Sequence, residues 1–232
     1  MMTPMQDWGR FPSNWIAKKG LERFSWGRCG TRGIAALRVY VALAQRLRDS
    51  GGVVRASYDA LGENTNLARA SVAAGLRLLE EEGLILSGAS AGGKGRYRFL
   101  EYDPKRGWAK LPAQKLYDGL QFRPFKAWHM RSQVELHALR LYLLIAARRD
   151  TDYNEAFLTY EKIHEMTGMK DAQITSGLSQ LNNSSMIYVV NHDREGHGMA
   201  RGYRIVGVEP YRHRGTTGRD LTAADLDSMA SF

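Results

Sequence analysis

The sequence has 232 residues, of which 44% are hydrophobic and 25% are charged, and its formal net charge at pH 7 is +9. These proportions are ordinary for a globular protein, and the length allows one large domain or two small ones. The basic balance favours a polyanionic partner, nucleic acid before an anionic membrane surface. The single cysteine, Cys29, excludes an intrachain disulfide and a cysteine-based metal site. The N-terminal residues lack the apolar core of a secretion signal, and the longest apolar runs are too short to span a bilayer. We therefore expect a cytoplasmic protein that does not enter membranes.

The first half of the chain begins with the segment Trp8-Gly9-Arg10-Phe11-Pro12, to which we assign no secondary structure from sequence. Further along, apolar residues recur at helical spacing, and Ser57 has the character of an N-cap for a short helix that begins at Tyr58. Turn residues around 64–66 separate this helix from a longer one. The elements expected are a helix over 34–47, a strand over 53–56, helices over 58–64 and 68–82, and a hairpin of strands 85–86 and 97–99.

A polar segment over 102–107 then interrupts the pattern, as a linker would. The second half predicts the same elements in the same order, and Thr159 takes the N-cap position that Ser57 has in the first half. These elements are a helix over 134–148, an extended segment over 156–159, helices over 160–166 and 171–182, and strands over 187–190 and 203–205.

The similarity of the two halves extends to their sequences. The run Ala36-Leu37-Arg38-Val39-Tyr40 matches Ala138-Leu139-Arg140-Leu141-Tyr142 at an offset of 102 residues, and the same offset aligns further residues without a gap. The opening segment is repeated as Trp108-Ala109-Lys110-Leu111-Pro112. Such self-similarity indicates an internal duplication. Other matched pairs are Tyr58 with Tyr160, Thr65 with Thr167, Gly75 with Gly177, Leu79 with Leu181, and Ile85 with Ile187.

A short helix, a tight turn, a longer helix and a β-hairpin are the pattern of a winged helix-turn-helix. Residues 64–72 followed by 76–85 resemble the recognition-helix region of bacterial winged-helix regulators, and so do residues 166–169 followed by 174–187. Two such units in one chain also resemble plasmid and phage replication initiators in their layout. The resemblance implies an α+β fold, mainly α, with two tandem winged helix-turn-helix domains that bind double-stranded DNA. The predicted organisation is an N-terminal segment plus first domain over 1–103, a linker and second opening segment over 104–127, a second domain over 128–208, and a basic tail over 209–232.

The resemblance also implies which residues meet DNA, because the second helix of the motif enters the major groove and the wing contacts the backbone. An alternative is that the basic residues are solvated surface side chains. Of the tail, a DNA-contacting arm and a solvated tail are both compatible with the sequence. The expected DNA-binding residues are Arg69, Ala70, Ser71, Ala74, Arg77, Lys94, Arg96 and Arg98 in the first unit, and Lys170, Gln173, Thr175, Ser176, Arg194 and Arg201 in the second.

The positive charge is distributed unevenly between the two units. Residues 128–210 carry 9 basic and 10 acidic side chains, whereas the preceding residues hold almost all of the excess positive charge. Because phosphate neutralisation drives non-specific affinity for DNA, the first unit is expected to be the stronger DNA-binding module. The second unit then reads DNA weakly, forms a homodimer or docks a partner protein.

The sequence contains no phosphate-binding loop, dinucleotide fingerprint, nucleophile elbow or metal-ligand spacing. We therefore expect a binding protein and not an enzyme, with no cofactor and no metal. Three functions fit these expectations: a transcriptional regulator, a replication initiator, and a protein-interaction adaptor in a nucleoprotein complex.

Overall fold

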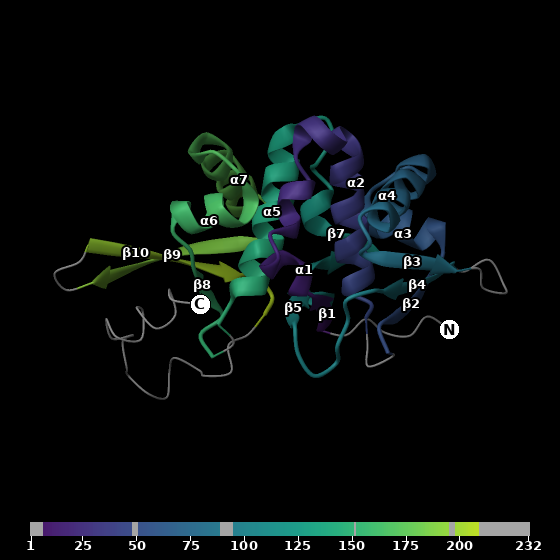
Figure 1. Cartoon of the computed structure of the whole chain (residues 1–232), viewed down its shortest axis with the longest axis horizontal. Coiled ribbons are helices and arrows are strands. Elements are labelled where there is room, and N and C mark those ends of the chain that lie inside the picture. Colours follow the sequence, from purple (N-terminus) through teal and green to yellow (C-terminus); the bar gives the residue numbers. More distant parts are fainter. Residues whose placement is uncertain (1–6, 48–50, 89–94, 151, 195–197, 209–232) are drawn as a thin grey trace.

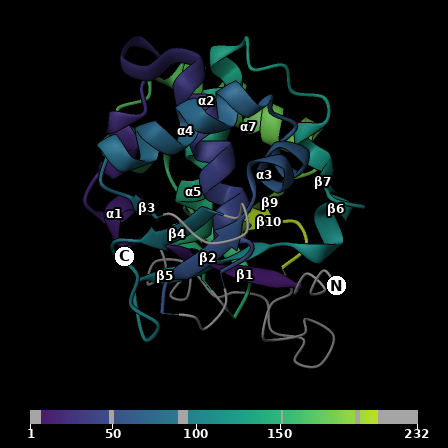
Figure 2. The same ribbon diagram turned by 90° about the vertical axis from the view of Figure 1, so that its right-hand side faces the viewer.

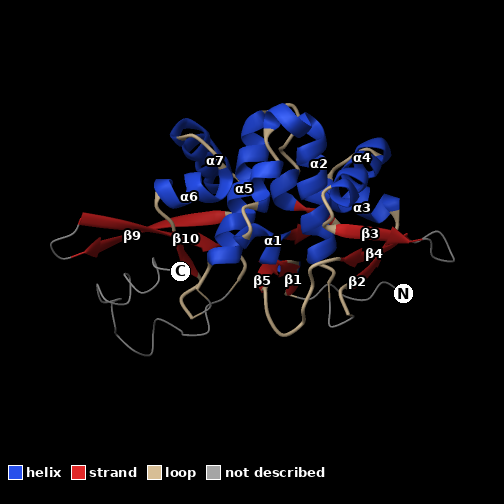
Figure 3. Ribbon diagram, in the orientation of Figure 1, coloured by secondary structure: helices blue, strands red, loops and turns tan. Residues whose placement is uncertain are grey.

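The computed structural model describes residues 7–47, 51–88, 95–150, 152–194 and 198–208. Its longer helices lie on one side and its strands on the other, with two long helices, α2 and α5, side by side in the middle (Figures 1 and 3). Viewed from the end, the same helical and strand layers are seen (Figure 2). The protein is thus a mixed α and β structure with small antiparallel sheets. The helices are α1 (Asn14–Ala17), α2 (Trp26–Ala44), α3 (Tyr58–Thr65), α4 (Arg69–Glu81), α5 (Gln133–Arg148), α6 (Tyr160–Thr167) and α7 (Asp171–Asn183), with 3-10 turns η1 (Gly20–Arg23), η2 (Gln114–Leu116) and η3 (Arg123–Phe125).

The strands form two three-stranded sheets and two smaller pairs. The first sheet has the order β2-β4-β3 and the second the order β8-β10-β9, so the last strand of each unit lies in the centre of its sheet. In both halves of the chain the order is a long helix, a strand, two helices and two strands. The strands are β1 (Trp8–Pro12), β2 (Val53–Ala56), β3 (Ile85–Gly88), β4 (Gly95–Phe99), β5 (Trp108–Pro112), β6 (Tyr117–Asp118), β7 (Gln121–Phe122), β8 (Glu155–Phe157), β9 (Ile187–Arg194) and β10 (Gly198–Ile205).

The ends of the helices follow local sequence rules. Ser57 and Thr159 cap α3 and α6, because their side-chain oxygens accept hydrogen bonds from the backbone nitrogen of the third helical residue, Ala60 and Lys162. Both N-caps were predicted from the sequence, and they are confirmed. Helix α2 begins earlier than predicted, at Trp26, and its regular geometry is broken at Gly30, where φ is +49°. Glycine tolerates this conformation because it has no Cβ.

Two of the matched glycines allow the helices to cross closely. A Cβ on Gly75 of α4 would lie 2.8 Å from the backbone carbonyl carbon of Ala35 in α2. A Cβ on Gly177 of α7 would lie 3.1 Å from the backbone nitrogen of Ala138 in α5. Each outer helix therefore rests on the backbone of a central helix, which leaves its other side facing outward.

The two opening segments pair with each other. Strands β1 and β5 are antiparallel, with Arg10 opposite Lys110. Trp8 and Trp108 stack with their ring centroids 6.0 Å apart, Arg10 lies over the Trp108 ring, and Lys110 lies over the Trp8 ring, each cation 4.6 Å from the ring centroid. Phe11 and Leu111 are fully buried on the opposite side of the pair. The two copies of the opening segment thus pair with each other and join the two halves of the chain.

Beyond β1 and β5, each opening segment reaches the other half of the chain. The η1 turn packs on α6, and the backbone oxygen of Leu21 accepts a hydrogen bond from Arg140 of α5. The β6–β7 hairpin packs on α3, where Asn64 donates to the oxygen of Leu120 and Asn66 donates to the oxygen of Phe125. One cluster of buried apolar side chains therefore runs from Phe11 to Val208 and includes residues from both halves. None of the helices in the described part of the chain is long and apolar enough to cross a membrane.

Candidate nucleic-acid interface

The first candidate surface is the exposed side of α4. Helix α3 ends before Asn66, which adopts a left-handed conformation with φ +55°. In this conformation the backbone N–H of Asn66 donates to the Gly62 carbonyl and the chain turns away from the axis of α3. Helix α4 then begins at Arg69. Arg69 and Ala70 are exposed, whereas the apolar side of the helix, with Val72 and Leu79, is fully buried. The start of α4 therefore projects from the molecule.

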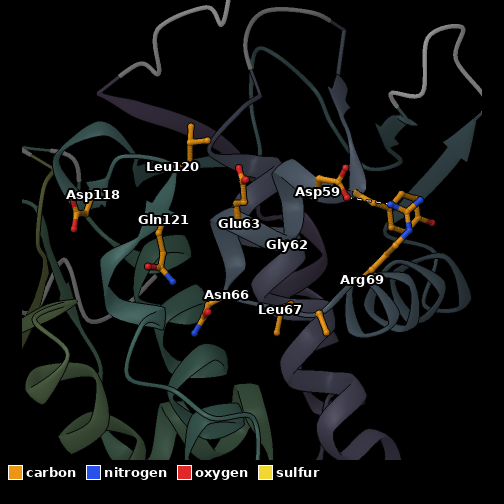
Figure 4. Close-up of a pocket in the computed structure, with 11 residues that line it drawn as sticks. Asp59, Gly62, Glu63, Asn66, Leu67, Arg69, Asp118, Leu120 and Gln121 are labelled. Atoms are coloured by element: carbon orange, nitrogen blue, oxygen red, sulfur yellow. Dashed lines mark hydrogen bonds and ion pairs between the residues drawn. The ribbon is translucent and has the colours of Figure 1, made fainter.

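Arg69 is held in place by its neighbours on α3. Its Nη1 lies 3.1 Å from Asp59 Oδ1, and its guanidinium lies over the Tyr58 ring, 5.1 Å from the centroid (Figure 4). The side chains of Arg69 and Asp59 are 72% and 82% exposed, so water screens this ion pair and it contributes little to stability. The contacts orient the guanidinium and leave it free to exchange the carboxylate for another anion.

The remaining candidates on α4 differ in exposure. Arg77 is exposed, and it forms no ion pair with a carboxylate among the residues that the structure describes. Ser71 and Ala74 are half-buried between the exposed and buried sides. The exposed side therefore presents two arginines, Arg69 and Arg77, separated by small side chains that would permit close approach of a partner.

A pocket adjoins the start of α4 on its hairpin side. It lies between α3, the turn after it and the β6–β7 hairpin, and Asp59, Glu63 and Asp118 contribute carboxylates to its lining (Figure 4). Among the described residues that line it, Arg69 alone carries positive charge. These carboxylates repel a phosphate from the pocket itself, so a polyanion that meets α4 is expected on the outward side of the helix, where Arg69 and Arg77 are exposed.

The predicted wing arginines lie on a different surface. Arg96 and Arg98 of β4 are both exposed, while Tyr97 and Phe99 between and beside them are buried against the helices. Since alternate strand residues point to opposite faces, the two arginines share the face of the first sheet that points away from the helices. Lys94, expected beside them, lies outside the described residues.

A third arginine on this face was missed in the sequence. Arg55 of β2 is exposed and stands directly opposite Arg96 in the antiparallel register. Directly opposed residues share a face of the sheet. The alternation within Val53-Val54-Arg55-Ala56 was a usable signal, because Val54 and Ala56 are the buried positions.

The corresponding positions of the second sheet carry no such excess of charge. There Arg204 stands opposite Glu155, and Nε and Nη2 of Arg204 both donate to Oε1 of that carboxylate. Phe157 and Gly202 form the next pair along the strands, where the first sheet has Arg55 and Arg96. The positive charge of the first sheet is therefore specific to that sheet.

Helix α7 presents a polar surface with little positive charge. Lys170 precedes it and is exposed, but Asp171 occupies the first position, where α4 has Arg69. Gln173 accepts a hydrogen bond from the Lys170 backbone at 2.9 Å, and Thr175 lies 3.2 Å from the Tyr160 hydroxyl. These local contacts already occupy part of the hydrogen-bonding capacity that base recognition would require.

The other candidates of the second unit lie on its long hairpin and within α7. Ser176 is half-buried and donates to the Gln173 carbonyl. Arg201 of β10 is exposed. Arg194 ends β9, and its side chain lies outside the described residues, as does the whole tail over 209–232. The second-unit candidates whose side chains are described therefore do not form one cationic surface.

Two buried arginines, which the sequence analysis did not single out, bind the C-terminal ends of α3 and α6. Arg38 of α2 donates to the backbone oxygen of Thr65, the last residue of α3, at 3.3 Å. Its counterpart Arg140 of α5 donates to the oxygen of Thr167, the last residue of α6. A cation at a helix C-terminus is favourable because the unpaired carbonyls there carry partial negative charge. The shared Ala-Leu-Arg run was the signal, since an arginine repeated inside an apolar helix requires a partner.

The surroundings of the two buried arginines differ. Arg38 also forms an ion pair with Glu135 of α5, Nη2 to Oε2 2.9 Å, whereas Arg140 bonds the Leu21 carbonyl instead. Burial lowers the pKa of both guanidinium groups to about 10, and the neighbouring Glu135 opposes this shift for Arg38. Both arginines stay charged at neutral pH, so the turns after α3 and α6 are anchored to the central helices.

The sequence matches no protein-family model and no curated protein.

Proposed function

We propose that this protein binds double-stranded DNA through two tandem winged helix-turn-helix units, with α4 as the principal recognition helix. The single observation that carries this proposal is the outward side of α4, where Arg69 and Arg77 are exposed and separated by small side chains. An arginine at the exposed start of such a helix suits the acceptor pair of guanine or a phosphate oxygen.

The arrangement of elements supports the proposal. In each half the two short-spaced helices are followed by a hairpin, and a glycine in the second helix permits close packing on the central helix. The net charge of +9 favours a polyanionic partner. The biological role that we propose is that of a transcriptional regulator or replication initiator, acting in the cytoplasm without a cofactor.

The second unit contributes less to DNA binding in this proposal. Asp171 at the start of α7 places negative charge where α4 has Arg69, whereas α6 and α3 both have a carboxylate in their first turn, Glu161 and Asp59. A partner protein or a second copy of the chain is therefore the alternative occupant of the α7 surface, as in an adaptor within a nucleoprotein complex.

The test is a binding titration of the full chain with duplexes selected from a random pool. Replacing Arg69 and Arg77 by alanine is expected to weaken binding at least 10-fold, since each well-placed arginine contact discriminates by about 1–3 kcal/mol. Replacing Lys170 and Gln173 by alanine serves as the comparison and is expected to have a smaller effect. An equal or larger loss from the second pair would contradict the assignment of α4.

The selected sequences distinguish the biological roles. A palindromic consensus is expected for a regulator that binds as a symmetric assembly, and iterated directional repeats are expected for an initiator. Failure of the wild-type chain to retain any duplex at low salt would favour the adaptor.

A further inference from the structure

The helix-free face of the first three-stranded sheet is the strongest surface that the proposed function leaves unused. We call Arg55, Arg96 and Arg98 on this face the arginine triad. All three side chains are exposed, and no ion pair joins them to a carboxylate in the described ranges of the chain. Like charges that stand opposite each other in a sheet repel, as Arg55 and Arg96 do here, so the triad is unfavourable unless an anion binds it.

The triad lies on the opposite side of its sheet from α4. Tyr97 and Phe99 point from the same strand into the helical side and are buried, which sets the two directions. In two perpendicular views the described helices of this half lie on one side of the sheet, and none of them covers its other face (Figures 1 and 2). A straight duplex that contacts α4 is therefore not expected to reach the triad.

Basic and aromatic side chains also lie between the first sheet and the centre of the molecule. A Cβ on Gly52, just before β2, would meet the Tyr102 ring, and the Tyr102 hydroxyl accepts a hydrogen bond from Arg10 of β1 at 3.2 Å. Arg10 in turn lies over Trp108 beside Lys110. Tyr102 thus links the start of β2 to the β1–β5 pair.

The arginine triad occurs in one half only. At the positions of the triad the second sheet has Phe157, Gly202 and an arginine, Arg204, that is neutralised by Glu155. A general requirement for solubility would not place the charge on one sheet alone. The spacing of exposed guanidinium groups along adjacent strands suits a row of phosphates, which bind arginine through charge-assisted and often bidentate hydrogen bonds.

We propose that the arginine triad binds the sugar-phosphate backbone of a second duplex segment, so that one molecule holds DNA on two faces. This inference rests on the proposed function of α4, because the first segment is the one bound there. Binding at the triad is independent of base sequence, since phosphates carry no sequence information directly.

The test measures two properties of the full-length protein. Retention of a labelled duplex by a second duplex fixed on beads reports bridging, and fluorescence anisotropy of a single selected duplex, at protein concentrations below those needed for bridging, reports binding at α4. The variant Arg55→Gln/Arg96→Gln/Arg98→Gln removes the triad. The matched control Lys105→Gln/Lys126→Gln/Arg131→Gln removes three exposed cations that do not belong to the triad.

The triad variant is expected to lose bridging at least 10-fold and to keep its affinity for the single duplex within about 3-fold. The salt dependence of the bridged complex should fall by about 2 to 3 in slope, because each lost phosphate contact contributes about 0.9. The control variant should bridge as the wild type does. Circular dichroism and thermal unfolding establish that both variants are folded.

Two results would overturn the inference. Wild-type protein that binds the selected duplex but retains no second duplex shows that the triad holds none, while the function proposed for α4 stands. Bridging that persists in the triad variant shows that another contact, such as self-association, joins the two duplexes. Loss of single-duplex binding on Arg69→Ala/Arg77→Ala tests α4 separately, so the two proposals fail in distinguishable ways.

Discussion

Arg38 and Glu135 form a buried ion pair between the two central helices, with Nη2 and Oε2 2.9 Å apart and side chains 0% and 7% exposed. Glu135 also accepts hydrogen bonds from the backbone nitrogens of His129 and Met130. The guanidinium of Arg38 lies over the Phe125 ring, 5.1 Å from its centroid. One pair thus connects the turn after α3 to the second opening segment.

Replacing Glu135 by alanine is expected to destabilise the protein by about 3–5 kcal/mol, because it leaves a buried guanidinium without its counter-charge. Urea unfolding measures this change. The control is Glu81→Ala, which breaks the exposed pair with Arg32 and should cost less than about 1 kcal/mol. Equal losses in the two variants would contradict a structural role for the buried pair.

Replacing Gly75 by alanine is expected to destabilise the protein by about 1–3 kcal/mol, since the added methyl group meets the backbone of α2. The direction of the stability change is informative, because a glycine-to-alanine change at an unhindered position inside a helix stabilises the helix. Gly88→Ala is the control, as its Cβ would lie 3.8 Å from the nearest atom, the Arg96 carbonyl oxygen. Thermal unfolding of both variants makes the comparison, and a Gly75→Ala protein as stable as the wild type would refute the close crossing.

His137 predicts a dependence of stability on pH. Burial, with a contribution from Arg140, lowers the pKa of His137 from 6.5 to about 4. Below pH 6.5 the imidazole of His137 is protonated in the unfolded chain but stays neutral in the folded protein. Its effect on the free energy of unfolding is therefore absent above pH 6.5, and the folded protein becomes less stable as the pH falls toward 4.

The variant His137→Ala is expected to reduce this pH dependence. Alanine fits the first copy of the repeat at the matching position, Ala35. Urea midpoints at several pH values between 4 and 7 measure the effect. An identical slope in the wild type and His137→Ala would exclude His137 as its source.

Asp59→Asn is expected to tighten DNA binding by about 2- to 5-fold, within the range that one exposed ion pair allows. The change removes the carboxylate that competes with DNA for Arg69 and reduces repulsion of phosphates. Anisotropy titration of the selected duplex measures the affinity. Glu161→Gln makes the same change of charge on α6 and is expected to have little effect; a larger gain from Glu161→Gln would indicate that α7 carries the stronger contact.

Much of the local structure was predictable because it depends on neighbouring residues. Apolar spacing placed the helices of both halves, and the Ser57 and Thr159 caps were evident from residue type. The pairing of β1 with β5 was not predictable, since nothing within Trp8–Pro12 states that its partner is another copy of the same pattern. Long-range pairing depends on the whole chain, and a short segment with two buried side chains fits several partners.

For the candidate DNA-binding residues, it was easier to predict which side chains are exposed than which of them share a surface. Arg69, Arg77, Arg96 and Arg98 are all exposed, as expected of residues on the polar side of a helix or strand. The sequence placed them in one interface, whereas the structure divides them between α4 and the far face of the sheet. The division arises because β4 turns its apolar residues toward the helices, and that choice fixes where its arginines point.

The exchange of opening segments has a consequence for the order of folding during synthesis. Residues 26–99 leave the ribosome before residues 114–135, yet Arg38 meets its carboxylate, and α3 its neighbouring hairpin, only in that later stretch. The first half is therefore expected to remain incompletely folded, with Arg38 unpaired and one side of α3 exposed, until the second half begins to emerge. A chain that stops before Glu135 should be prone to aggregation or degradation, so the two halves are made one after the other but mature together.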